Sequence, residues 1–361
     1  MIDRRKFLQT SAALALAGPA MAAPAVNSVG LRATAQAKGF MYGAAAANYQ
    51  RDVPAFTPAL AREAGILVAE YESKRDEIEP AEGQFDFSGT DLLLSYAQSH
   101  DMAFRFHPLV WYAANPDWLE PAVLATKKEA LYLSYVDRVM RRYHGKLHSV
   151  DVVNEALLPG DGRSDGLRNS FWLKAFGPSY IDNAFHAARQ ADPSALLIYN
   201  DWGFEAGDAE NDLFRATTLK FLDGLLKRGV PVDGLGLQGH LDAFQHKIDQ
   251  KKLAIFLDEV KARGLKILVT EMDVYDNNGP ADIATRDTAV ADTSRRFLDV
   301  VLANSATSAV LTWGLSDHFL KAEGLRENIL RGTPRRLPLD SNFQRKPMWD
   351  ALAKSFSARS V

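Results

Sequence analysis

Eight short apolar runs recur along the chain, with helical patterns between them. The runs cover residues 40–44, 66–69, 103–106, 149–153, 196–199, 235–237, 267–270 and 309–312. Apolar residues at three-to-four spacing predict amphipathic helices in several of the connecting segments, at 129–143, 181–190, 211–227 and 292–302. A strand followed by a helix, eight times over, predicts an α/β fold made of a single (β/α)₈ TIM barrel.

The composition is that of one well-cored globular protein. The chain has 361 residues, of which 47% are hydrophobic and 10% aromatic, so one barrel of ordinary size uses nearly all of it. A net charge of −3 argues against a nucleic-acid partner, which usually needs a basic face. The chain has no cysteine, and this excludes disulfides, thiolate nucleophiles and cysteine-ligated metals.

The first residues are typical of a bacterial export signal. Two arginines and a lysine at 4–6 precede a mildly apolar stretch at 10–16, and Ala-Met-Ala at 20–22 gives a small-x-small cleavage site. The apolar stretch falls short of the roughly 20 residues that span a membrane. We therefore predict export by the twin-arginine machinery to the periplasm or the medium, no stable membrane association, and three regions: a twin-arginine-type signal peptide at 1–23, a flexible lead-in at 24–38 and the catalytic barrel at 39–356.

Two phrases place a carboxylate directly after an apolar run. They are Asp-Val-Val-Asn-Glu, ending at Glu155, and Leu-Val-Thr-Glu-Met-Asp, which contains Glu271. Either phrase alone could be a helix N-cap. In a parallel barrel, however, both carboxylates would lie at the same face, at the carboxyl ends of their strands. Two carboxyl groups at one site are the minimum set that cleaves a glycosidic bond. The working hypothesis is a glycoside hydrolase.

Polar or aromatic side chains also end the other apolar runs. Because active sites of such barrels lie at the carboxyl ends of the strands, these side chains would surround one cleft. Each of them alone could be a satisfied core polar group. They are Glu70, His107, Asn154, Asn200, Asp201, Gln238, His240 and Trp313.

Two motifs that would imply a cofactor or a metal are set aside. Residues 234–239 spell G-x-G-x-x-G, but the glycines lie inside the apolar run and do not open a helix, as dinucleotide binding requires. The histidines and carboxylates show no metal-ligand spacing such as H-E-x-x-H. We expect neither a cofactor nor a metal.

An ordered series of motifs resembles glycoside hydrolase family 10, the family of β-1,4-xylanases. The motifs lie at 151–157, 188–193, 199–201, 232–241, 270–273 and 312–317, and the similarity covers about residues 40–352. The resemblance implies a retaining mechanism with Glu155 as acid/base and Glu271 as nucleophile. It gives supporting roles to Asn154, His240 and Asp273.

The same resemblance implies a substrate site for a β-1,4-linked polysaccharide or oligosaccharide. Its residues would be Glu70, Lys74, His107, Trp111, Asn200, Gln238 and Trp313. Five positions depart from the residues that the family usually has: Tyr71, Arg75, Tyr112, Ala114 and Lys321 stand in place of Asn, Trp, His, Gln and Trp. We interpret these as an altered subsite for the sugar next to the cleaved one on its non-reducing side.

The sequence does not decide between several substrates and modes of action. A retaining endo-β-1,4-xylanase with a shifted preference is the main interpretation, and a monomer is expected. A β-1,4-glucanase or an exo-acting β-glycosidase on the same barrel remains an alternative, since one fold hosts many specificities. A non-catalytic glycan-binding protein is a further alternative, although a pure binder has no need of the full catalytic set.

Overall fold

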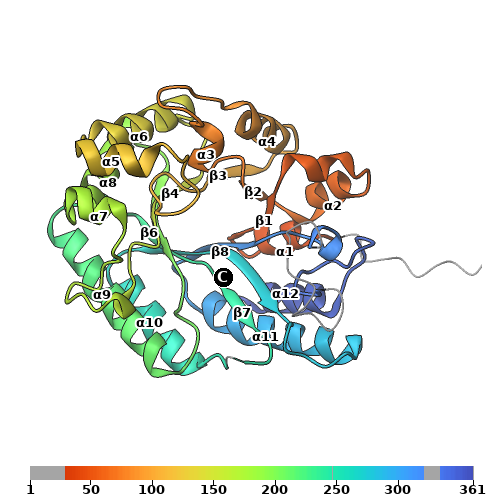
Figure 1. Cartoon of the computed structure of the whole chain (residues 1–361). Coiled ribbons are helices and arrows are strands. Elements are labelled where there is room, and N and C mark those ends of the chain that lie inside the picture. The colour runs from red at the N-terminus through yellow and green to blue at the C-terminus, as the bar shows by residue number, and fades with distance from the viewer. Residues whose placement is uncertain (1–28, 246, 321–333, 361) are drawn as a thin grey trace, which may run out of the picture.

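Eight parallel strands close into a barrel, as predicted (Figure 1). The computed structural model describes residues 29–245, 247–320 and 334–360. Neighbouring strands pair in chain order, and β6 pairs with β8 to complete the circle. The strands are β1 (Met41–Ala46), β2 (Ile66–Ala69), β3 (Ala103–Phe106), β4 (Ser149–Asn154), β5 (Leu196–Asp201), β6 (Gly234–Leu237), β8 (Lys266–Tyr275) and β9 (Thr307–Thr312).

Helices surround the barrel (Figure 1). In α6 the buried residues are Tyr132, Tyr135, Val136, Val139 and Met140, at helical spacing. No helix among residues 29–245, 247–320 and 334–360 is long and apolar enough to cross a membrane. The α-helices are α1 (Leu31–Gln36), α2 (Phe56–Glu63), α3 (Arg75–Ile78), α4 (Ser88–Ser99), α5 (Leu119–Thr126), α6 (Ala130–Arg142), α7 (Phe171–Phe176), α8 (Ser179–Ala191), α9 (Ala209–Lys227), α10 (Gln250–Ala262), α11 (Ile283–Ala303) and α12 (Pro347–Ala358), with short 3₁₀ turns at Asn48–Asp52, Pro159–Asp161 and Asp317–Phe319.

The inside of the barrel is filled by side chains. Strands β2 and β4 are buried along their whole length. This explains why β2 reads as an unbroken apolar run in the sequence, whereas Ser149, Asp151 and Asn154 interrupt the run of β4. A compact cluster separate from the main core occupies the interior, as expected for a filled barrel. It consists of Ala45, Ile66, Val68, Ile198, Leu268, Ala309 and Leu311.

Strand β8 is longer than predicted and carries both acidic residues of its motif. The short strand β7 (His240–Asp242) pairs with it and sets His240 opposite Asp273. Against β9 the register of β8 shifts between Val269 and Met272. Glu271 therefore lies at an irregularity inside the strand, whereas the apolar pattern predicted that the strand would end before it.

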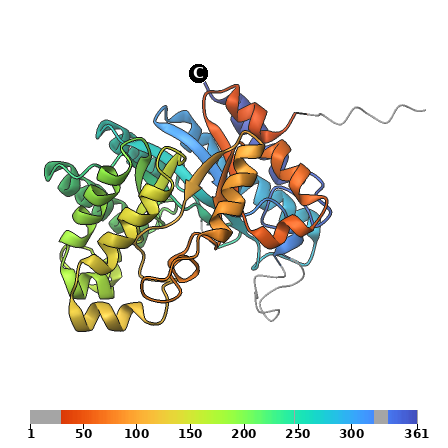
Figure 2. The same ribbon diagram turned by 90° about the horizontal axis from the view of Figure 1, so that it is seen from above.

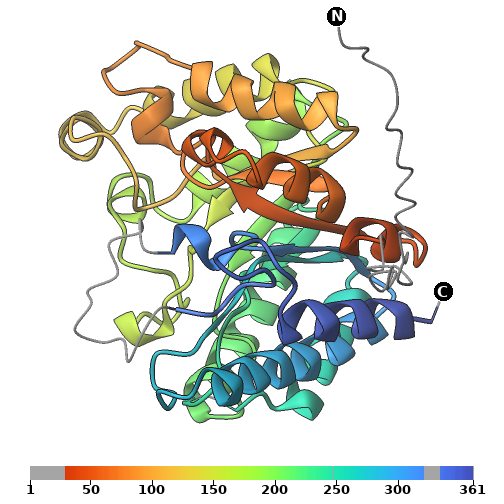
Figure 3. The ribbon, with the colours of Figure 1, turned by 90° about the vertical axis from the view of Figure 1, so that its right-hand side faces the viewer.

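The prediction of a flexible lead-in was wrong for residues 29–38. This segment contains helix α1, in which Leu31 and Ala35 are buried. The Leu31 N–H donates to Glu63 Oε2 at 2.8 Å, and Lys38 Nζ donates to the Arg359 carbonyl at 3.0 Å. Figures 2 and 3 show α1 and the C-terminus at the same end of the molecule, where α1 contacts α12. Residues 1–28, with the predicted signal peptide, lie outside the described residues.

Candidate active site

Glu155 follows β4 in a backbone conformation that few residues other than glycine adopt. Its φ is +53°, and its N–H donates to the Asn200 carbonyl at 2.9 Å. A non-glycine residue in the left-handed region costs of the order of 1–3 kcal/mol and persists where the surroundings hold it. The turn leaves the Glu155 side chain buried at the carboxyl end of the strand, where the fold places its chemistry.

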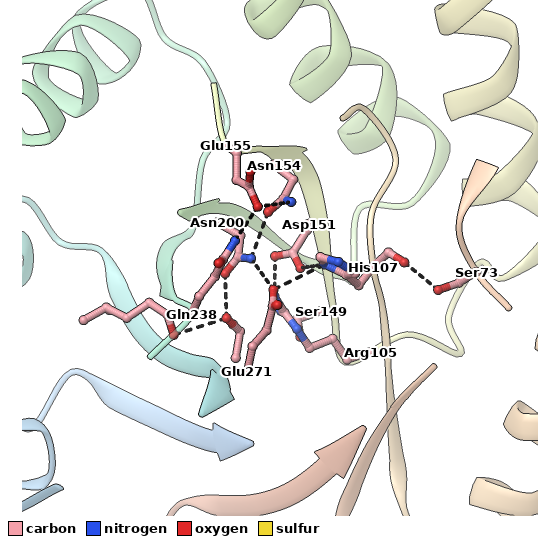
Figure 4. Close-up of polar contacts among 12 residues, drawn as sticks. Ser73, Arg105, His107, Ser149, Asp151, Asn154, Glu155, Asn200, Gln238 and Glu271 are labelled. Carbon is pink, nitrogen blue, oxygen red and sulfur yellow. Dashed lines mark hydrogen bonds and ion pairs between the residues drawn. The ribbon is translucent and has the colours of Figure 1, made fainter. Parts of the chain in front are cut away.

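The two oxygens of Glu155 face different groups, and Figure 4 shows the amides around one of them. Oε1 accepts a hydrogen bond from Gln238 Nε2 at 2.8 Å, and the Asn154 amide lies 3.4 Å from it. Oε2 lies 3.8 Å from Arg168 Nη2, while Arg168 Nε donates to the Glu155 carbonyl at 2.8 Å. Neutral amides therefore hold one oxygen, and the other lies beside a guanidinium.

Glu271 is buried among donors and cations. Oε1 accepts from Asn200 Nδ2 at 2.8 Å and lies 3.8 Å from His107 Nδ1, and Oε2 lies 3.3 Å from His240 Nε2. Burial opposes ionisation of this carboxyl, but the charges of His107 and His240 and the hydrogen bonds outweigh it. They lower the pKa of Glu271 to about 2. Glu271 is therefore a carboxylate at any ordinary pH.

His240 connects Glu271 to a second carboxylate. Its Nδ1 lies 2.8 Å from Asp273 Oδ1. Burial alone would lower the pKa of His240, but the charge and hydrogen bond of Asp273, together with Glu271, raise it to about 10. At neutral pH both ring nitrogens thus carry protons, and His240 donates to Asp273 and Glu271 together.

Asn154 and Asn200 form an amide bridge between the two carboxylates. Asn200 accepts from Thr270 Oγ1 at 2.6 Å, so its nitrogen is the atom that faces Glu271 and Asn154. The Asn154 atom at 2.9 Å from this nitrogen must then be an acceptor, which directs the Asn154 nitrogen toward Glu155. The reverse orientation would gain the Trp111 Nε1 donor at 3.2 Å and the Asn200 carbonyl acceptor at 3.3 Å, but it would set two N–H groups against each other at 2.9 Å.

A buried series of hydrogen bonds and an ion pair fixes the His107 ring. Asp151 accepts from His107 Nδ1 at 2.8 Å and also bonds Arg105, which donates to Ser149 Oγ at 3.1 Å (Figure 4). Sequence reasoning missed Asp151 as a site residue, although it lies in the same phrase as Glu155. The signal that could have found it is its burial in the middle of an apolar strand, where a charge needs a partner.

Lysine and aromatic side chains form one wall of the site. Lys74 Nζ lies 4.9 Å from the ring centre of Tyr71, 5.4 Å from that of Trp111 and 5.8 Å from that of Trp313. Burial lowers the pKa of Lys74, against the opposing charge of Glu271 and other carboxylates. The Trp313 ring also packs edge-on at 5.6 Å from His107.

Glu70 lies near this wall. It accepts from Gln50 Nε2 at 3.0 Å, and its charge acts on Lys74. The structure thus gathers the predicted catalytic, supporting and substrate-binding residues at the carboxyl end of the barrel.

Three of the five divergent positions lie near this wall. Tyr71 is 44% exposed and donates to Asp76, and Tyr112 is 38% exposed, with the Arg168 guanidinium 4.2 Å from its ring centre. The Ala114 carbonyl accepts from the Asp76 N–H at 3.3 Å. Burial and the nearby Glu155 raise the pKa of Tyr112, so its hydroxyl stays protonated.

Arg75 was wrongly assigned to the subsite. Its guanidinium is buried and pairs with Glu79 at 2.7 Å, donates to the Leu131 carbonyl at 2.6 Å and lies 4.3 Å from the Tyr135 ring centre. All three partners belong to the layer of helices and loops outside the barrel, so Arg75 contributes to packing there. The remaining divergent position, Lys321, lies outside the described residues.

A cavity of about 910 Å³ extends from Glu155 and His240 past β5. Trp202 is 37% exposed in its wall and stacks on Phe214, with ring centres 6.0 Å apart. Sequence reasoning stopped at Asp201 and missed Trp202. An exposed tryptophan directly after a motif that ends a strand is the signal that could have found it.

Among the residues that the structure describes, no group of three or more histidine and acidic side chains is arranged to hold a metal ion. The acidic residues of the site instead bind amide and imidazole groups of the protein.

Comparison with known proteins decides the family. The model of glycosyl hydrolase family 10 matches residues 30–355. The chain belongs to this family. It is 30% identical over 332 residues to endo-1,4-beta-xylanase B of Thermotoga neapolitana, covering 90% of this chain and 91% of that one. It is 32% identical to endo-1,4-beta-xylanase 1 of Humicola insolens, covering 81% of this chain but 65% of that longer protein.

The solved structures agree with this assignment. Xylanase 10B from Thermotoga petrophila, crystallised with xylobiose, superimposes on this glycoside hydrolase with a TM-score of 0.80 at 28% identity. The alignment covers 92% of this chain and 98% of the crystallised xylanase. The similarity therefore extends over the whole barrel.

Proposed function

We propose that this family 10 enzyme is a retaining endo-β-1,4-xylanase. The observation that carries the proposal is the contrast between its two carboxyl groups. Glu271 is held ionised by two histidines and an amide, as a nucleophile requires. Glu155 accepts from the neutral amide of Gln238 and lines the open cavity, where a departing sugar chain would lie.

The reaction would proceed in two displacements. In the first, Glu155 gives its proton to the glycosidic oxygen while a Glu271 oxygen attacks the anomeric carbon, so the bond to the leaving chain breaks and a glycosyl ester forms. In the second, Glu155 takes a proton from water as the water attacks the same carbon, and the bond to Glu271 breaks. The first step leaves Glu155 ionised and Glu271 esterified, and the second step restores both carboxyl groups to their starting forms.

The polar groups around the carboxylates suit the sugar in this reaction. The Asn154 amide could bond the 2-hydroxyl of the sugar under attack, a contact that strengthens in the transition state. Lys74 and His107 would bond the other hydroxyls of that sugar, while the Gln238 amide nitrogen donates to Glu155. Trp313 would pack against its apolar face.

Xylan is proposed as the polymer because of the relatives. Those named above are xylanases, and one was crystallised with xylobiose. The subsite next to the cleaved sugar is proposed to be altered, since Tyr71, Tyr112 and Ala114 replace one carboxamide, one imidazole and another carboxamide. Their polar contacts with an undecorated xylose would then be lost or replaced, and decorated xylan or short oligosaccharides become the preferred substrates.

Product analysis tests this proposal. The enzyme is incubated with linear xylo-oligosaccharides, arabinoxylan, glucuronoxylan and mixed-linkage glucan, beside Glu155→Ala and Glu271→Ala. Xylo-oligosaccharides absent from both variants are the expected result, with faster cleavage of a decorated xylan. An ordinary endo pattern on linear xylan would contradict the altered subsite, and cleavage of glucan alone would contradict xylan. Binding without any product would leave only a glycan-binding protein.

We also propose that the precursor is exported by the twin-arginine route. The arginine pair, the short apolar stretch and the Ala-Met-Ala site at 20–22 support this. Residues 1–38 fused to a reporter that folds in the cytoplasm should carry it to the periplasm. Replacing Arg4 and Arg5 by lysine should stop that transport, and continued transport would contradict the proposal.

A further inference from the structure

Asp273 forms ion pairs with two cations, His240 and Arg336. Its Oδ1 lies 2.8 Å from His240 Nδ1, and its Oδ2 lies 3.4 Å from Arg336 Nη1. The side chains of Asp273 and Arg336 are 1% and 4% exposed. A buried carboxylate is stable only when both of its oxygens are well paired. Here each oxygen faces a different cation.

The backbone and an aromatic ring fix Arg336 in this place. It lies in the segment between β9 and α12, more than sixty residues after Asp273. The Val274 N–H donates to the Arg336 carbonyl at 3.3 Å, which aligns this segment along the end of β8. The Arg336 guanidinium lies 4.8 Å from the ring centre of Tyr275. The arginine is thus positioned by the same strand that carries Asp273 and Glu271.

Charges of opposite sign alternate from this arginine to the candidate nucleophile. Arg336 is positive, Asp273 negative, His240 positive and Glu271 negative, with contacts of 3.4, 2.8 and 3.3 Å between successive members. His240 also feels the charge of Glu205, which follows β5. An arginine does not lose its proton in proteins, so its charge on Asp273 is permanent.

We propose that Arg336 is a positioning residue of the reaction. By occupying Oδ2 of Asp273 it leaves Oδ1 to His240, and His240 is thereby held with its second N–H on Glu271. The inference rests on the proposed double displacement. Arg336 does not touch the substrate, and its effect reaches the nucleophile only through Asp273 and His240.

Three variants separate this role from a purely structural one. Arg336→Met removes the charge at similar length, and Arg336→Lys keeps it. Arg286→Met is the matched control, because Arg286 is equally buried and pairs with Asp276 at 2.9 Å. Neither residue belongs to the series Arg336, Asp273, His240 and Glu271, which we call the relay. Both methionine variants should lose thermal stability.

The kinetic constants should change in Arg336→Met but not in Arg286→Met. In Arg336→Met we expect kcat to fall about tenfold with KM nearly unchanged. The acid limb of the pH profile should move up by about half to one pH unit, since His240 is then held less firmly against Glu271 and stabilises its negative charge less. Arg336→Lys should recover most of this. An identical response of Arg336→Met and Arg286→Met would overturn the proposal.

A double-mutant cycle tests whether the effect passes through His240. In a His240→Asn background, Arg336→Met should shift the acid limb no further. A full additional shift would show that Arg336 acts independently of the relay, against the proposal.

Nitrogen-15 spectra of the histidine rings give a readout that does not depend on activity. In the wild type and in Arg286→Met, both ring nitrogens of His240 should be protonated at pH 8, with a slowly exchanging Nδ1 proton. In Arg336→Met that proton signal should move or disappear. If it does so while the wild type cleaves no glycan, the proposed function fails and the relay stands. If the enzyme is active and neither the signal nor the profile responds, the relay fails.

Discussion

Gln238 contacts both candidate catalytic carboxyl residues. Its Nε2 donates to Glu155 Oε1 at 2.8 Å, and its carbonyl accepts from the Glu271 N–H at 2.9 Å. The residue that follows β6 thus connects the strand carrying one carboxyl group to the side chain of the other. A side-chain substitution removes only the first of these contacts, because the second uses the backbone.

Gln238→Ala is therefore expected to impair proton donation specifically. A hydrogen bond to a charged group is worth about 1.5–3 kcal/mol, so kcat should fall about ten- to a hundredfold on natural substrates. Aryl xylosides with a good leaving group need little protonation and should be affected much less. Equal losses on good and poor leaving groups, measured side by side, would argue against an acid role for Glu155.

His240→Asn should weaken the ionisation of Glu271. The imidazolium helps to lower the pKa of Glu271 to about 2, so its removal raises that pKa and moves the acid limb of the pH profile upward. The expected shift is at least about one pH unit, as for a charge removed at hydrogen-bonding distance. A pH profile that keeps its acid limb in this variant would contradict the assignment.

The same histidine makes stability depend on pH. Its pKa rises from 6.5 in a free side chain to about 10 in the folded protein, so its contribution is fully present below pH 6.5 and is lost as pH rises through 10. Melting temperatures should therefore decline between pH 7 and 10. The decline should be smaller in His240→Asn, and parallel curves for the two proteins would contradict this account.

Trp202→Ala tests the cavity beyond Glu155. The ring lies 37% exposed in the cavity wall, where a sugar of the leaving chain could stack on it. Losing such a platform should raise KM for xylohexaose at least about fivefold, since aromatic contacts contribute about 1 kcal/mol beyond the area they bury. An aryl xyloside, whose leaving group is a single small ring, serves as the internal control. Equal effects on both substrates would place Trp202 outside the binding of the leaving chain.

Arg75→Met should destabilise the fold without changing the chemistry. The substitution leaves Glu79 buried without its cation, which typically costs about 3–5 kcal/mol. Arg141→Met, which breaks an exposed pair with Asp137, should cost less than about 1 kcal/mol. Denaturant unfolding measures both. The kcat of folded Arg75→Met, titrated by active-site labelling, should match the wild type, and a changed product pattern would return Arg75 to the subsite.

The apolar runs predicted the barrel because buried parallel strands are apolar on both faces. β2 and β3 have the predicted bounds. The pattern failed at β8, where Glu271 and Asp273 interrupt the apolar run although the strand continues to Tyr275. Pairing with β7, which depends on tertiary structure, extends that strand. The small residues at 29–38 likewise gave no sign that Leu31 would find a buried site.

The candidate site was predictable where chemistry and motif coincide. The carboxylates and their amide and imidazole partners lie at strand ends, which the fold brings together. Arg336 and Arg168 were not predictable, because their partners are distant in the sequence or are backbone carbonyls. Arg75 shows the opposite error, since its neighbours in the motif contact the site while its own side chain packs outward.

Trapping the reaction intermediate tests the central claim most directly. In a 2-deoxy-2-fluoro-β-xylobioside with a good leaving group, the fluorine slows both displacements. The good leaving group speeds only the first, so the glycosyl ester accumulates. Mass spectrometry of the digested protein should show one fluoroxylobiosyl group on the peptide containing Glu271, and none in Glu271→Ala. Turnover of the compound with no adduct, or an adduct on another residue, would contradict a double displacement through Glu271.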